Sequence, residues 1–93
     1  MKDRNGIELE RGDILLISIG NYIISGIFIK PGVSNNLNYY KLSNYVLTQL
    51  INDGRRLGYL ASSFDNEHRY VKITKDLLIP SEQDLYDQMI KLI

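Results

Sequence analysis

The sequence contains no cysteine, which excludes disulfides and thiolate metal sites and fits the reducing cytosol. It also has no Asn-x-Ser/Thr sequon, and residues 1–6 form a polar start without an apolar signal core. The longest apolar runs, Ile14–Ile17 and Ile27–Ile29, are far shorter than the roughly 20 residues that span a bilayer. These absences predict a cytoplasmic protein without a membrane segment.

Groups for catalysis are scarce as well. The sequence has no phosphate-binding GxxxxGK[ST], no GxGxxG and no GxSxG nucleophile motif. Its one histidine, His68, follows Asp65 and Glu67 in a predicted turn, where short polar residues are expected for turn geometry alone. A Ser-His-Asp set drawn from this single hairpin could not converge as true triads do. We therefore predict no enzyme, no catalytic residue, no metal site and no cofactor.

The net charge is zero, with 11 basic and 11 acidic residues, which argues against generic binding to nucleic acid. The charges are unevenly distributed, however. Residues 41–75 carry a net charge of +3, and residues 76–93 carry −3. This polarity is typical of ordinary solvated surface, and it also allows a basic central face for an anionic partner.

The chain has 93 residues, so we predict a single domain over 1–93. Patterns of β-branched and alternating residues predict strands at 13–19, 22–30, 39–42, 59–64 and 69–74. Gly20-Asn21 predicts a tight hairpin turn between the first two strands. Gly26 lies inside the second strand, where a glycine often marks a bulge or a sharp coil of the sheet.

Two helices are predicted. Ser43 can cap a helix over 44–53, whose apolar face would hold Val46, Leu47, Leu50 and Ile51; a strand through 45–47 is the alternative. Pro80-Ser81 opens the second helix, with Ser81 and Asp84 as a capping box and an apolar stripe of Leu85, Met89 and Leu92. Leu92 and Ile93 would be exposed unless they pack, which favours a homo-oligomer.

The segment Gly6–Asp13, Gly-Ile-Glu-Leu-Glu-Arg-Gly-Asp, leads directly into an aliphatic strand. It resembles the entry to SH3-like and KOW-type β-barrels, in which a Gly-Asp corner sets up the first strand. Asn- and Ile-rich chains of this length with this opening are similar to small accessory proteins of tailed bacteriophages. The fold class we predict is α+β, a small curled antiparallel sheet or an SH3-like barrel of about five strands, with an inserted helix and a C-terminal helix. Those helices depart from a minimal barrel, so no ligand site is carried over.

Binding residues are better represented than catalytic ones. Seven tyrosines are present, and this residue suits interfaces and base stacking, although an AT-rich genome also raises its frequency. Adjacent strand residues point to opposite faces, so at most one of Tyr39 and Tyr40 is expected in the core. Arg55 and Arg56 follow a helix end, which favours cations in any case. Arg69 and Lys72 should lie on opposite faces of one strand. The candidate ligand- or partner-binding residues are Tyr39, Tyr40, Arg55, Arg56, His68 and Arg69.

Three functions follow from these observations. The first is a phage accessory protein, located in the host cytoplasm, that binds or inhibits a host or bacterial defence-system protein. The second is a binding or sequestering protein for a small anionic ligand such as a signalling nucleotide. The third is a KOW-like nucleic-acid binder, which the basic central segment allows.

Overall fold

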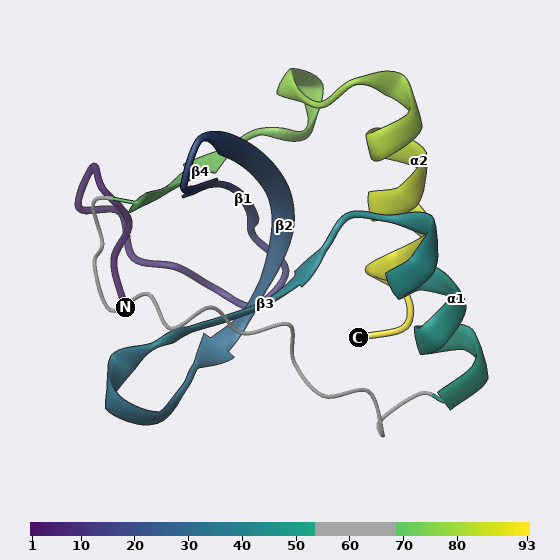
Figure 1. The fold of residues 1–93 in the computed structure, drawn as a ribbon, viewed down its shortest axis with the longest axis horizontal. Helices are drawn as coiled ribbons and strands as arrows, with labels where there is room; N and C mark the ends of the chain where they lie inside the picture. The colour runs from purple at the N-terminus through teal and green to yellow at the C-terminus, as the bar shows by residue number, and fades with distance from the viewer. Residues whose placement is uncertain (54–68) are drawn as a thin grey trace.

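The computed structural model describes residues 1–53 and 69–93. The strands there are β1 (Ile14–Ile19), β2 (Tyr22–Pro31), β3 (Leu37–Lys41) and β4 (Tyr70–Ile73), and the α-helices are α1 (Asn44–Asp53) and α2 (Pro80–Met89). The strands form one antiparallel sheet in the order β3-β2-β1-β4. Figure 1 shows α1 and α2 side by side at one end of this curved sheet.

The fold class is α+β, as expected, but the described sheet is open and has four strands. A closed SH3-like barrel is therefore not what this part of the chain forms. The strand predicted at 59–64 lies outside the described residues. The helix predicted over 44–53 is confirmed with the same bounds, and the strand alternative for 45–47 is wrong.

The β1–β2 hairpin forms where the glycine-asparagine pair predicted it. Ile19 pairs with Tyr22, so Gly20 and Asn21 make a two-residue turn, and Gly20 has a positive φ of 56°. Asn21 has no positive φ, and a positive φ at the first turn position alone is the pattern of a type II′ turn, whose twist suits a hairpin. Of the bulge or sharp coil predicted at Gly26, the bulge is not there, since Gly26 pairs with Leu15 and Lys41 and the irregular register lies between Phe28 and Lys30. Gly26 instead leaves space for the ring of Tyr39.

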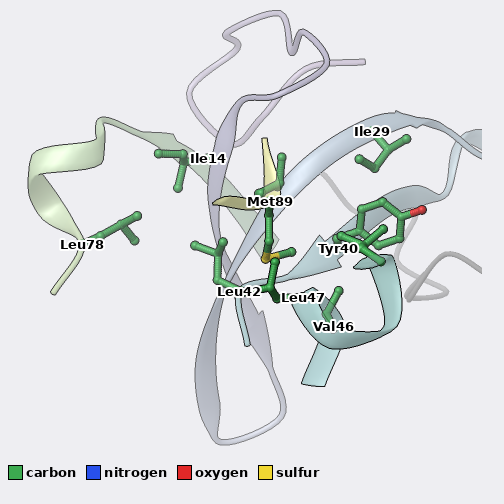
Figure 2. Close-up of a cluster of buried hydrophobic side chains, with 10 residues drawn as sticks. Ile14, Ile29, Tyr40, Leu42, Val46, Leu47, Leu78 and Met89 are labelled. Atoms are coloured by element: carbon green, nitrogen blue, oxygen red, sulfur yellow. The ribbon is translucent and has the colours of Figure 1, made fainter. Parts of the chain in front are cut away.

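The sheet has a hydrophobic core on each face. Ile14, Ile27, Tyr40 and Leu42 belong to the first core, while Leu15, Ile17, Phe28 and Tyr39 belong to the second. Both cores follow from strand alternation, since successive side chains point to opposite faces. The first core is closed by Val46, Leu47 and Leu50 of α1 and by Met89 of α2. Figure 2 shows Met89 among side chains from the sheet and from α1. The second core is closed by Leu9, Leu37 and Tyr70, with Met1 packed against it.

The helix ends confirm some sequence predictions and correct others. Ser43 Oγ accepts the N–H of Val46 at 3.2 Å, so it caps α1 as predicted. Ile51 is 63% exposed and not part of the buried face of α1. The capping box at Ser81 is also wrong, because α2 begins at Pro80 after Ile79 and Ser81 is already inside the helix.

The end of the chain differs from the predicted apolar stripe of α2. Met89 is fully buried and Leu85 packs against the first core, as expected. Leu92, by contrast, is 46% exposed, whereas Ile93 packs against the first core within the same chain. Because Ile93 packs within its own chain, only Leu92 still supports the homo-oligomer predicted from these two residues.

The N-terminal segment is joined to β4 by the buried carboxylate of Asp3, which is 1% exposed. Its Oδ1 accepts the backbone N–H groups of Asn5 and Ile7 at 2.9 and 2.8 Å, and its Oδ2 accepts that of Lys72 at 2.8 Å. The N–H of Arg4 donates to the carbonyl of Tyr70 at 3.0 Å. Hydrogen bonds from three N–H groups offset the cost of burying this carboxylate.

Replacing Asp3 with alanine tests this connection. We expect Asp3→Ala to lower the free energy of unfolding by about 2–4 kcal/mol, because buried N–H groups lose a charged acceptor. Glu10→Ala is the matched control, since Glu10 is exposed, and it should change stability by less than about 0.5 kcal/mol. Urea unfolding followed by circular dichroism measures both. Equal stability of the two variants would contradict the structural role of Asp3.

The Gly12-Asp13 corner is the point at which α2 docks on the sheet. Gly12 has a φ of 97°, and its carbonyl accepts the hydroxyl of Tyr86 at 2.8 Å. The positive φ favours glycine at this corner, and a Cβ at Gly12 would also lie 3.1 Å from Ile90 Cδ1, a close contact. Burial, and secondly the charge of Asp13, raises the pKa of Tyr86 above its usual value of 10.0.

Tyr86→Phe should therefore have a pH-dependent effect. Below pH 10 we expect the variant to be less stable by about 1 kcal/mol, because the hydroxyl no longer donates to Gly12. Since the folded-state pKa is raised, the unfolded chain loses its tyrosine proton first, and the wild type loses this advantage as the pH rises from about 10 through the folded-state pKa. Urea unfolding at pH 8 and at several pH values above 10 measures the difference. A constant difference across this range would contradict the assignment.

Candidate functional site

One part of the sheet is left uncovered by the helices. α1 and α2 cover the end of the first face that holds Ile14 and Ile27. Further along β1, Leu16 and Ser18 lie on the same face as Ile14, at the end that neither α1 nor α2 covers. Here Ile23 is 65% exposed, beside its partner Ser18. We call this surface the open face. It is lined by Arg4, Leu16, Ser18, Ile23, Arg69, Tyr70 and Val71.

The open face is a shallow depression of about 150 Å³ with a cationic edge. Arg69 directly precedes β4, and the hydrogen bond from Arg4 to the carbonyl of Tyr70 brings a second arginine to the same edge. Both arginines are exposed, and the described lining contains no carboxylate. Asp3, which directly precedes Arg4, is buried and bound by three backbone N–H groups. The open face therefore combines aliphatic surface with two guanidinium groups.

The open face is smaller than a usual small-molecule site, and its described lining holds few groups that could take part in acid–base chemistry. Small-molecule sites are usually enclosed clefts of about 300–1,000 Å³, which is larger than this open depression. Its described lining has no histidine or carboxylate that could act as a general base. Among residues 1–53 and 69–93 there is also no cluster of three potential metal ligands. No helix in these two ranges has the length and hydropathy that crossing a membrane requires.

The predicted tyrosine pair is placed differently from expectation. Tyr39 and Tyr40 point to opposite faces, as predicted, but both are buried, with 5% and 6% exposure. The expectation that at most one is in the core is wrong because both faces of β3 are covered. The ring of Tyr39 lies over Gly26, where a Cβ would come within 2.9 Å of it. Burial raises the pKa of Tyr39. Neither side chain contributes to the open face.

Of the predicted basic residues, Arg69 lines the open face. Lys72 is on the opposite face, as predicted, where its Nζ lies 3.3 Å from Asp13 Oδ1. Lys75 forms a 2.7 Å ion pair with Asp87. Arg55, Arg56 and His68 lie outside the described residues. In the described part of the chain, the basic central segment thus does not form a single cationic surface.

Sequence reasoning missed most of the open face. Aliphatic residues fill most of the predicted strand 13–19, so the pattern did not single out Leu16, which is half-buried, or Ser18, which is exposed. The two serines Ser18 and Ser25 could have indicated an exposed end of the sheet, because each interrupts one of the two aliphatic strands of the hairpin. Arg4 gave no such signal, because only the folded chain brings it beside β4.

Comparison with protein-family models, curated proteins and solved structures finds no match to this chain.

The buried position of Tyr39 can be tested against an exposed tyrosine of the same sheet. We expect Tyr39→Ala to destabilise the protein by about 3–5 kcal/mol, because a large buried ring leaves a cavity above Gly26. Tyr22 is 63% exposed, so Tyr22→Ala should cost less than about 1 kcal/mol. Thermal and urea unfolding measure both. Similar losses for the two variants would contradict a core role specific to Tyr39.

Proposed function

We propose that this chain is a non-enzymatic binding protein whose open face takes a protein partner, acting as a phage-type accessory protein on a host or defence-system protein. The observation that carries this proposal is the end of the first face that α1 and α2 leave uncovered, where exposed Ile23 on β2, half-buried Leu16 and Val71, and two arginines beside β4 line one surface. Arginine is enriched at protein interfaces, and aliphatic surface supplies the apolar contact that they need.

The depth and charge of the open face favour a protein over the other two candidate ligands. A nucleotide would need a more enclosed site than this shallow depression. Proteins that hold duplex DNA commonly make about 6–10 phosphate contacts, whereas the described lining offers two cations. A protein surface with an acidic rim and an apolar centre matches both the shape and the charge.

The experiment is affinity capture with matched variants. The tagged protein is incubated with bacterial lysate, and the captured protein is then purified so that its dissociation constant can be measured. Ile23→Asp and Arg4→Glu should each weaken binding by about tenfold or more, because each places a carboxylate in the open face. Arg11→Glu is the control, since it reverses an exposed arginine outside this surface.

The outcomes separate the candidate functions. Equal capture by wild type, Ile23→Asp and Arg4→Glu would remove the open face from the proposal, provided that unfolding midpoints show all three to be folded. Absence of any stoichiometric partner would count against a host-protein target. A thermal shift with nucleotides at millimolar concentration, without any protein partner, would favour the small anionic ligand instead.

A further inference from the structure

A second surface of the chain is complementary to the open face. Between β4 and α2, Asp76, Leu77 and Ile79 are exposed, the two apolar side chains by 67% and 60%. Glu82 follows in the first turn of α2. We call this surface, residues 76–82, the acidic loop. Its composition mirrors that of the open face: an aliphatic centre with two carboxylates, against an aliphatic centre with two guanidinium groups.

The acidic loop is held in a defined conformation. Leu78 is buried in the first core, so its neighbours Leu77 and Ile79 are turned outward. A short 3-10 helix at Lys75–Leu77 precedes it, and Gln83 Nε2 donates to the carbonyl of Leu78 at 3.0 Å. An exposed apolar pair on a structured loop loses little conformational entropy when it is covered, which favours binding.

Of the two carboxylates in the acidic loop, that of Asp76 is exposed and that of Glu82 is half-buried. Asp87, further along α2, is already paired with Lys75 at 2.7 Å. In the described part of the chain, neither Asp76 nor Glu82 takes part in an ion pair. Two acids without an ionic partner in the described chain therefore stand before and after the exposed Leu77 and Ile79.

We propose that the open face of one copy of this chain binds the acidic loop of a second copy. Leu77 and Ile79 of the second copy cover Ile23 and Leu16, and Asp76 and Glu82 approach Arg4 and Arg69. The contact joins two different surfaces, so it either closes about a symmetry axis or adds further copies. Opposite charges steer the two surfaces together and set their relative orientation.

This contact does not depend on the host-protein proposal, although it uses the same face. Its test contains only the purified chain, so a negative result leaves a host partner possible. Conversely, failure of the lysate experiment leaves self-association untouched. Where both hold, self-association and partner binding compete for the open face.

The test is a charge-swap experiment by sedimentation velocity. We expect the wild type to associate reversibly, with a weaker association at high salt. Arg4→Glu alone and the double variant Asp76→Lys/Glu82→Lys alone should each raise the dissociation constant by about tenfold or more. An equimolar mixture of the two should associate again, because an unchanged open face meets an unchanged acidic loop and the altered surfaces carry opposite charges.

Two control variants test whether the effect is confined to the open face and the acidic loop. Arg11→Glu and Glu10→Lys reverse exposed charges outside both surfaces and should leave association unchanged. Urea midpoints close to that of the wild type show that the charge-swap variants are folded. A wild type that stays monomeric at about 1 mM overturns the inference. So does an assembly that both charge reversals leave intact, or a mixture that fails to associate.

Discussion

The buried carboxylate of Asp3 is the interaction on which the open face depends. By accepting the N–H of Lys72 along with two N–H groups of its own turn, it holds the N-terminal segment along the outer side of β4. The neighbouring hydrogen bond from Arg4 to Tyr70 then brings two arginines, distant in sequence, to one edge of the sheet. A buried carboxylate is tolerated only with such partners, so this segment has few alternative positions.

Covering both faces of a four-stranded sheet is the second constraint. The helices close the first core, while the N-terminal segment, Leu37 and Tyr70 close the second. β3 is consequently buried on both sides, which is why two adjacent tyrosines are core residues. Gly26 belongs to the same arrangement, because only a residue without Cβ leaves space for the ring of Tyr39. α1 and α2 extend over only one end of the first face, and the end that these two helices leave uncovered is the open face.

The basic and acidic residues that are separated along the sequence are grouped differently in the folded chain. Lys72 and Lys75 are paired with Asp13 and Asp87, so they compensate local acids. Arg69 lines the open face together with Arg4, which belongs to a segment of balanced charge. On the acidic side, Asp76 and Glu82 flank exposed aliphatic side chains. The acidic loop thus lies in the segment of net charge −3, whereas the open face takes one arginine from the basic central segment and one from a segment of balanced charge.

Local patterns were sufficient for most of the secondary structure. Alternation and turn chemistry determined the β1–β2 hairpin at Gly20-Asn21, and helical spacing after Ser43 determined α1, because these signals act between residues close in the chain. Only the tertiary structure decided that the described sheet is open, that Tyr39 and Tyr40 are both buried, and that Arg4 lies beside Arg69. Each of these depends on which segments cover which face of the sheet, and contacts between distant residues leave no periodic signal in the sequence.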